Sequence, residues 1–247
     1  MKISFLGTNG WYDTKTGNTT CTLLKTRNYN IVLDAGNGIY KLDQYIKNKN
    51  PVYLFLSHFH VDHISGLHIL NKFNFKQGIN IYGPPGTKDA LNRIINKPYT
   101  VPFAKLEFKV KVHELTEGLH KIPFTLISKP LIHSTTCFGY RFELNNKIIA
   151  YCTDTGICEN AIELAKNADI LITECSFKIG QSNPEWPHLN PEDAAQIAKE
   201  ANAKKLVMTH FDANNYKTLK ERELAETHAK KIFRNSYAAF DNRDVVI

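Results

Sequence analysis

Short apolar runs divide the chain into expected strands and helices. In the first hundred residues, runs rich in β-branched and aromatic side chains predict strands at 2–7, 19–26, 30–34 and 52–57. Between and after these runs, the spacing of apolar residues predicts helices at 37–48, 63–72 and 86–96. Strand patterns then dominate from Leu106 to Cys152. We therefore expect a strand-rich first half with short helices along its flanks.

The second half alternates helices and strands more clearly. Helices are expected at 158–167, 190–201 and 216–233, and strands at 169–173 and 205–209. Asn190 followed by Pro191 is typical of a helix start, with asparagine as the N-cap and proline in the first turn. Strands flanked by helices predict an α/β fold in which two sheets pack together and are covered by helices on both outer faces. No linker, repeat or change in composition marks a boundary, so we expect a single domain over residues 1–247.

The densest cluster of chemically active side chains follows the strand at 52–57. Residues 58–63 are His-Phe-His-Val-Asp-His. Side chains alternate along an extended segment, so His58 and His60 point the same way and can share one metal ion. Asp62 and His63 follow as the chain turns, and they can reach a second ion. Imidazole and carboxylate together suit zinc and similar divalent ions. A surface cluster that binds metal by accident is the alternative, but gathering three imidazoles and an acid argues against it.

Three later residues share one context, because each follows the carboxyl end of an apolar strand. They are His133, Asp154 and His210. Strand ends commonly position functional side chains on loops above a rigid sheet. Taken singly, a loop histidine, a turn-capping aspartate and a strand-ending histidine would each be ordinary. A metal pair with only four ligands is incomplete, however, so the cluster at 58–63 favours all three as further ligands.

Composition narrows the setting of this chemistry. The chain has 247 residues, of which 43% are hydrophobic and 22% are charged, as in ordinary globular proteins. No apolar run approaches the roughly 20 residues that span a bilayer, and the apolar amino end is too short for a signal peptide, so we expect a cytoplasmic protein without membrane contact. The net charge of +7 is dispersed and favours anionic partners. Five scattered cysteines argue against a disulfide framework.

The candidate ligands, in their order along the chain, resemble the ligand set of the metallo-β-lactamase fold. The matching motifs are the cluster at 58–63, His133, Asp154 within Thr-Asp-Thr-Gly, and His210 within Thr-His-Phe. The resemblance runs from Phe5-Leu6-Gly7-Thr8 through Leu33-Asp34-Ala35-Gly36 to the last strand. It implies an αββα sandwich that binds two zinc ions, with Mn²⁺ as the alternative metal.

The resemblance also implies a role for each ligand. His58, His60 and His133 would hold the first ion. Asp62, His63 and His210 would hold the second, and Asp154 would bridge the two. Asp34 would orient ligands from behind, although a simple turn aspartate before Gly36 is an equally good interpretation.

Two zinc ions roughly 3.5–4 Å apart lower the pKa of a shared water and clamp a phosphoryl oxygen, so hydroxide attack on a phosphodiester is expected. The leaving alkoxide then needs a proton from a group with a pKa near neutrality, and histidine suits this role. His188, just before the expected helix at 190–201, is the candidate acid, and Glu174 is its expected partner. The alternative is an exposed loop histidine and an unrelated glutamate. Asp62, His188 and Glu174 are the expected catalytic residues.

Within this fold the chain is most similar to the ribonuclease Z-type phosphodiesterase branch. Residues 173–177, Thr-Glu-Cys-Ser-Phe, resemble that branch's His-Glu-Ala-Thr motif, and His188 resembles its helix-start histidine. The Thr-Pro-Gly turn of glyoxalase- and lactamase-type members is missing after His133. Val61 and Thr173 depart from the tRNA-processing pattern. Only 20 residues separate His133 from Asp154, which leaves no room for a tRNA-gripping arm.

By size and layout the chain therefore resembles compact cyclic-nucleotide phosphodiesterases of the kind that counter Pycsar defence. That resemblance implies a small phosphodiester or nucleotide substrate and a homodimer. Processing of tRNA 3′ ends is the first alternative, and a non-phosphate hydrolase or an inactive metal-binding module is the second. Trp11, Tyr12 and Tyr99 are candidates for base stacking or an interface, but core packing is the preferred interpretation for each.

Overall fold

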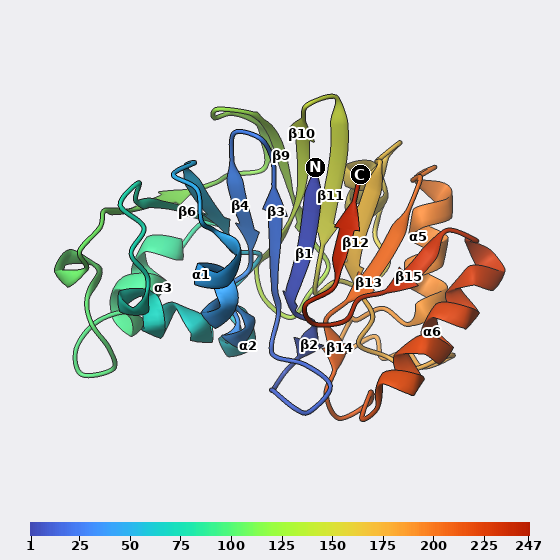
Figure 1. The fold of residues 1–247 in the computed structure, drawn as a ribbon. Helices are drawn as coiled ribbons and strands as arrows, with labels where there is room; N and C mark the ends of the chain where they lie inside the picture. The colour runs from blue at the N-terminus through green and yellow to red at the C-terminus, as the bar shows by residue number, and fades with distance from the viewer.

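Two mixed sheets of seven strands each pack face to face (Figure 1). The structure is a computed structural model that describes residues 1–247. The first sheet has the order β16-β1-β3-β4-β5-β6-β7, with bounds β1 (Lys2–Gly7), β3 (Cys21–Lys25), β4 (Asn30–Leu33), β5 (Val52–Phe55), β6 (Ile79–Gly83), β7 (Val110–Glu114) and β16 (Asp244–Val246). The second has the order β15-β13-β12-β11-β10-β9-β8, with bounds β8 (Gly118–Lys121), β9 (Thr125–Leu131), β10 (Cys137–Leu144), β11 (Lys147–Cys152), β12 (Ile170–Glu174), β13 (Leu206–Thr209) and β15 (Ser236–Ala238).

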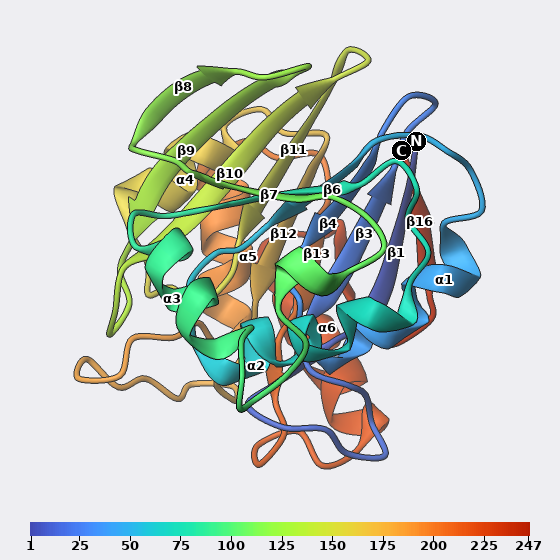
Figure 2. The same cartoon turned by 90° about the vertical axis from the view of Figure 1, so that its left-hand side faces the viewer.

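Helices cover the outer face of each sheet, which confirms the expected αββα sandwich. The first sheet is covered by α1 (Leu42–Tyr45), α2 (Val61–Ile64), α3 (Thr87–Ile94) and 3₁₀ segments at Asn37–Lys41 and Ser65–Lys72, as Figure 2 shows. The second is covered by α4 (Glu159–Ala165), α5 (Pro191–Glu200) and α6 (Leu219–Ile232). A third 3₁₀ segment spans Phe103–Lys105. None of these helices combines the length and apolar character needed to cross a bilayer.

Alternation along the strands divides the core into three layers. Along β5, Tyr53 and Phe55 point between the sheets, whereas Leu54 packs under the helices of the first sheet. Along β12, Ile172 points between the sheets and Leu171 packs under the helices of the second. This two-residue period is what a strand buried on both faces requires. The five cysteines form no disulfide, and all except the half-buried Cys158 are buried.

Some expected helices begin or end elsewhere. The segment expected as one helix at 37–48 is a 3₁₀ turn followed by the single turn of α1. The last helix does not begin at Tyr216 but at Leu219, where Thr218 and Glu221 form a capping box. Tyr216 is buried and its ring contacts Phe211, so tertiary packing takes it out of the helix.

The two sheets are joined along one edge of the sandwich. The Phe138 amide donates to the Ser57 carbonyl at 2.9 Å, which links the start of β10 to the loop after β5. Two short strands, β2 (Asn9–Gly10) and β14 (Phe211–Asp212), pair in parallel beside this edge (Figure 1). The carboxyl ends of β5, β9, β11, β12 and β13 all open onto it, because β11, β12 and β13 are parallel and β9 runs in the same direction. Loops from both sheets therefore meet there.

Candidate metal centre and active site

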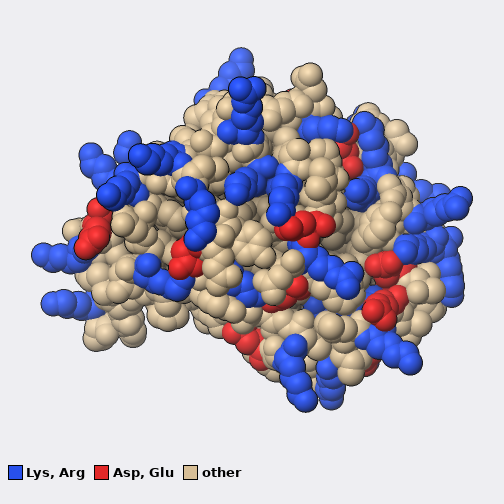
Figure 3. Space-filling view, viewed as in Figure 1, with Lys and Arg blue, Asp and Glu red and all other residues tan.

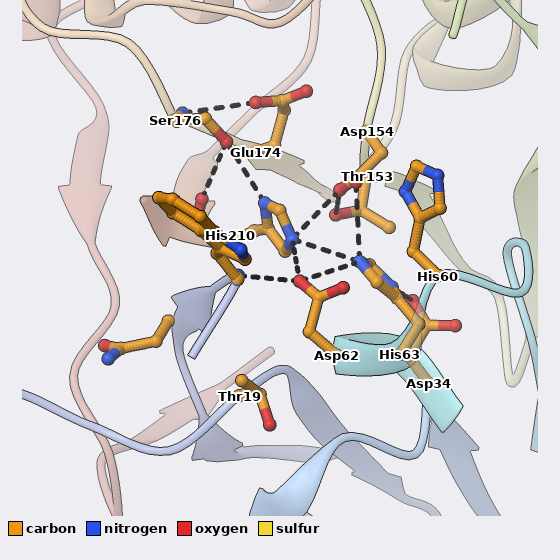
Figure 4. A network of polar contacts seen from close by, with 12 residues as sticks. Thr19, Asp34, His60, Asp62, His63, Thr153, Asp154, Glu174, Ser176 and His210 are labelled. Atoms are coloured by element: carbon orange, nitrogen blue, oxygen red, sulfur yellow. Dashed lines mark hydrogen bonds and ion pairs between the residues drawn. The ribbon is translucent and has the colours of Figure 1, made fainter. Parts of the chain in front are cut away.

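All seven residues predicted as metal ligands meet at this edge. The loop after β5 and the start of α2 provide four of them, and the segments after β9, β11 and β13 provide His133, Asp154 and His210. Their ligand atoms form two adjacent groups: His58, His60, His133 and Asp154 in one, and Asp62, His63 and His210 in the other. Asp154 is only 3% exposed and lies between the groups (Figure 4).

Within the first group the donor atoms are spaced as metal ligands are. His60 Nδ1 lies 3.2 Å from His133 Nε2. Asp154 Oδ2 lies 3.5 Å from His58 Nε2 and 3.8 Å from His133 Nε2. A tetrahedral zinc with ligands at about 2.0–2.1 Å needs donor atoms about 3.3–3.4 Å apart. The spacing therefore fits a shared divalent ion.

The second group has the same spacing. His210 Nε2 lies 3.0 Å from His63 Nε2 and 3.2 Å from Asp62 Oδ2. Asp154 touches this group too, with Oδ1 at 3.2 Å from His210 Nε2 and Oδ2 at 3.4 Å from His63 Nε2. Both carboxylate oxygens of Asp154 thus face imidazoles of the second group, as Figure 4 shows. Oδ2 also faces imidazoles of the first group. This is the position that a bridging ligand requires.

One orphaned atom supports the same interpretation. His58 is fully buried, and its Nδ1 lies 3.0 Å from the Ser57 hydroxyl. The opposite ring nitrogen, Nε2, is buried without a hydrogen-bond partner. A buried polar atom without a partner is costly unless something else satisfies it. A metal ion would satisfy this nitrogen, and the donor set of imidazoles and carboxylates suits one.

The ionisation of the histidines differs between the two groups of ligands. Burial, with the neighbouring His63, holds the pKa of His58 well below its ordinary value, and burial lowers the pKa of His133 to about 4. Burial also disfavours a charged His63, but Asp154 and Asp34 outweigh it and raise the pKa of His63 well above its ordinary value. Protons on such a histidine partly neutralise the carboxylates. A metal ion that binds here must displace them.

Asp34 supports the ligands from behind the site. It is fully buried after β4, and its Oδ2 lies 2.9 Å from His63 Nδ1. The same carboxylate accepts hydrogen bonds from the Ser57 amide at 2.7 Å and from the Tyr151 hydroxyl at 2.7 Å. Such a contact fixes which nitrogen of His63 faces the metal position. The geometry therefore favours the orienting role of Asp34 over that of a plain turn residue.

Backbone strain is concentrated at this site. Nine residues other than glycine have a positive φ, and five of them are asparagines, which tolerate this conformation. The other four are Trp11 (φ 72°), Asp34 (56°), Asp154 (55°) and His210 (51°). Each is a ligand, a ligand's partner or a neighbour of the ligands. Strained residues persist where the surrounding structure holds them, typically at functional sites.

His188 and Glu174 form a closely bonded pair beside the ligands. His188 Nδ1 lies 2.6 Å from Glu174 Oε1, and the side chain of His188 is only 8% exposed. Glu174 is itself held by the amides of Thr155 at 2.7 Å and Ser176 at 3.1 Å. Burial disfavours a charged His188, but the Glu174 carboxylate outweighs it and raises the pKa of His188 to about 9. Bound cations next to it would lower that value toward neutrality.

A pocket of about 640 Å³ opens in front of these groups. It is lined by Gly10, Trp11, His60, Val61, Asp62, Asp154, Ser176, Trp186, His188, His210 and Asp212. Expectations from sequence included six of these as site residues or stacking candidates. The five that sequence reasoning missed as lining residues are Gly10, Val61, Ser176, Trp186 and Asp212. The core-packing interpretation was wrong for the three aromatic candidates, because Trp11, Tyr12 and Tyr99 are 65%, 42% and 75% exposed.

Gly10 lies against the ring of His210, and this contact gives a test of the site. A Cβ atom at position 10 would come within 2.5 Å of His210 Cε1. Gly10→Ala is therefore expected to displace the imidazole and lower the total zinc per chain after zinc loading, measured by elemental analysis of the purified protein. Gly180→Ala is a matched control, since a Cβ there meets no atom within 4 Å, although its φ of 69° strains the backbone. Full zinc content in Gly10→Ala would show that His210 is not held as we describe.

Comparison with known proteins identifies the family to which this chain belongs. The family described as "Beta-lactamase superfamily domain" matches residues 29–211. The chain belongs to this superfamily. It is accordingly a metal-dependent hydrolase, and the seven clustered side chains are candidates to hold the metal.

Individual relatives match over the whole chain. Ribonuclease Z of Bacillus velezensis is 29% identical, with 100% of this chain and 99% of the relative covered. Among solved structures, the metallo-β-lactamase fold protein YhfI of Bacillus subtilis has a TM-score of 0.80 at 26% identity, covering 99% and 98% of the two chains. Human tRNase Z, short form, has a TM-score of 0.78 at 24% identity, covering 100% and 99%. The resemblance to the ribonuclease Z-like branch is thus confirmed.

Proposed function

We propose that this chain is a dinuclear zinc phosphodiesterase that hydrolyses small phosphodiesters such as cyclic nucleotides. The observation that supports the proposal most directly is the Glu174–His188 pair, in which the buried Glu174 holds His188 at the wall of the pocket that the ligand cluster also lines. Hydrolysis of a phosphodiester releases an alkoxide, which is more basic than the thiolate that a thioester releases. A protonated imidazole poised beside the metal ligands suits the departure of such an alkoxide.

Two zinc ions held by the clustered histidines and aspartates would supply an activated water and neutralise charge on the phosphoryl oxygens. The protein's own groups would do the rest. Glu174 holds Nδ1 of His188, which leaves Nε2 to give its proton to the leaving oxygen. Asp62 borders the pocket, where its Oδ2 accepts the Trp11 amide at 2.7 Å, so the turn after β2 holds this carboxylate in place beside His210.

The shape of the chain favours a small substrate. The stretch between His133 and Asp154 is filled by the hairpin of β10 and β11, which turns through Asn145 and Asn146 without an inserted arm. The match to the Bacillus velezensis ribonuclease Z extends over 310 positions, so roughly sixty of them have no counterpart among the 247 residues here. The pocket has the size of a small-molecule site. On the face drawn in Figure 3, Lys and Arg are interspersed with Asp and Glu and form no continuous basic track for a tRNA body.

Processing of tRNA 3′ ends is the second candidate function. It is favoured by full-length relatives named ribonuclease Z, including one from Microcystis aeruginosa that is 30% identical. In this case a surface other than the missing arm would have to hold the tRNA. A homodimer, expected from the resemblance to compact phosphodiesterases, stays a prediction.

One substrate panel separates the candidates. Zinc-loaded protein is incubated with bis(p-nitrophenyl) phosphate, several cyclic nucleotides, a precursor tRNA and a thioester. We expect turnover of the first two classes, and the Asp154→Asn variant purified in parallel controls for contaminating phosphodiesterases. Cleavage of precursor tRNA far faster than cyclic nucleotides would favour the second candidate. Turnover of the thioester alone would exclude both.

A further inference from the structure

Both tryptophans of this chain line the same pocket. The sequence contains only two, Trp11 and Trp186. Their side chains are exposed to 65% and 48%, although indole is among the side chains that gain most from burial. Neither ring provides a candidate metal ligand or the candidate proton donor. Two large apolar rings left open in one pocket suggest that a ligand covers them.

The two rings flank different parts of the ligand cluster. The ring of Trp186 is stacked at 6.2 Å and 11° on His60, and it lies 6.1 Å from His133, so it borders the first group. Trp11 borders the second group, because its amide donates to Asp62 and its neighbour Gly10 lies against the ring of His210. The pocket in front of the ligand cluster is therefore bordered by one indole beside each group.

Trp11 is held in this exposed position rather than left on a mobile loop. Its φ of 72° is unfavourable for a bulky residue, and such strain needs support from the surrounding structure. Arg222, fully buried in α6, provides that support by donating to the Thr8 hydroxyl at 2.7 Å and the Thr16 hydroxyl at 3.2 Å, and by bonding Asn9 Oδ1. These contacts fix the loop on both sides of Trp11. An exposed ring on a strained, anchored backbone is preorganised for contact.

We propose that Trp11 and Trp186 form a two-walled aromatic clamp that stacks on the base of a nucleotide substrate. This proposal rests on the proposed phosphodiesterase function and narrows its substrates to those with an aromatic base. Base stacking on aromatic side chains tolerates any base, because every base has a π face, so the clamp provides affinity and selects nucleotides over base-free phosphodiesters. Purines, with the larger face, should bind more tightly than pyrimidines.

Tryptophan fluorescence tests the clamp without relying on turnover. Trp11→Phe leaves Trp186 as the only reporter, and Trp186→Phe leaves Trp11, while each phenylalanine keeps an aromatic ring in place. The zinc-loaded variants are titrated with adenosine 5′-monophosphate and, as the base-free probe, with ribose 5-phosphate. We expect saturable quenching of both reporters by the nucleotide and little by the sugar phosphate. Quenching of only one reporter, or equal quenching by the two ligands, would overturn the clamp.

A kinetic ratio gives a second, independent readout. For each variant, kcat/KM for cyclic AMP is divided by kcat/KM for the 3,5-cyclic phosphate of methyl ribofuranoside, which has no base. Trp186→Ala and Trp11→Ala should each lower this ratio roughly 5- to 150-fold, equivalent to about 1–3 kcal/mol of stacking, and phenylalanine should restore most of it. Tyr99→Ala, which removes an exposed ring outside the pocket, should leave the ratio unchanged.

The two readouts distinguish the clamp from the function on which it rests. If no phosphodiester is hydrolysed but the nucleotide still quenches both reporters, the clamp stands and the proposed reaction fails. If cyclic nucleotides are hydrolysed but the alanine variants leave the ratio unchanged, the reaction stands and the clamp fails.

Discussion

Replacing His188 by alanine is expected to reduce kcat for cyclic nucleotides by about 10²–10⁴-fold, the usual contribution of general acid catalysis, while the zinc content stays unchanged. The reason is the geometry of the pair: Glu174 Oε1 holds His188 Nδ1 at 2.6 Å, so the other ring nitrogen is the only one free to act on a substrate. The loss should be smaller for a p-nitrophenolate leaving group, which departs without a proton.

The pH dependence of turnover tests whether His188 acts as an acid. Despite its burial, His188 has a pKa raised to about 9 by Glu174, so at neutral pH the imidazole is protonated and competent as an acid. Turnover should therefore fall as the pH rises through the pKa of His188, which bound metal places between neutrality and that value. The alkaline decline should disappear in His188→Ala. Glu174→Gln, which removes the charge at nearly constant volume, should shift the decline to lower pH.

The control for this prediction is His228→Ala, which removes a histidine of α6 outside the pocket and should change neither turnover nor zinc content. His188, Glu174 and Asp154 also lie close enough to one another to hold a metal ion. Loss of zinc from His188→Ala would mean that the residue is a ligand, and the general-acid role would then be wrong.

Replacing Asp154 by asparagine is expected to lower zinc occupancy in both groups at once and to reduce turnover by more than about 100-fold, beyond the range of partners that only orient ligands. Asp154 is the one side chain that lies within 3.8 Å of His58, His63, His133 and His210 together. An amide keeps the shape but removes the charge that both cations would share. No other carboxylate in the cluster can replace it.

Zinc per chain, measured by elemental analysis, and the zinc-dependent rise in melting temperature test this prediction. Metal that binds only the folded state stabilises it by mass action, so the wild type should melt at a higher temperature with zinc and Asp154→Asn should respond far less. Asp89→Asn, which alters an exposed carboxylate on α3, is the matched control. Two zinc ions per chain in Asp154→Asn would contradict the bridging assignment.

Sequence patterns were most informative where the physics is local. The alternation along a strand places His58 and His60 on one side, and the capping residues before Pro191 begin α5 as expected, with Asn190 accepting the Asp193 amide. The same reasoning failed for Tyr216, because burial against Phe211 and the capping box at Thr218 outweigh its helical spacing. It also failed for Trp11, because the average tendency of indole to be buried says nothing about a loop anchored by the remote Arg222.

By itself, the sequence determined the two-sheet architecture, the seven candidate ligands and the candidate acid, since these depend on short-range periodicity and on side-chain types that are costly to gather without a function. Only the tertiary structure decided which groups meet. Packing of the two sheets brings His133 and His210 to the residues after β5, pairs Glu174 with His188, and leaves Trp11 and Trp186 open to one pocket. These contacts join positions far apart in the chain, and their distances follow from strand order and sheet packing, which no local pattern specifies.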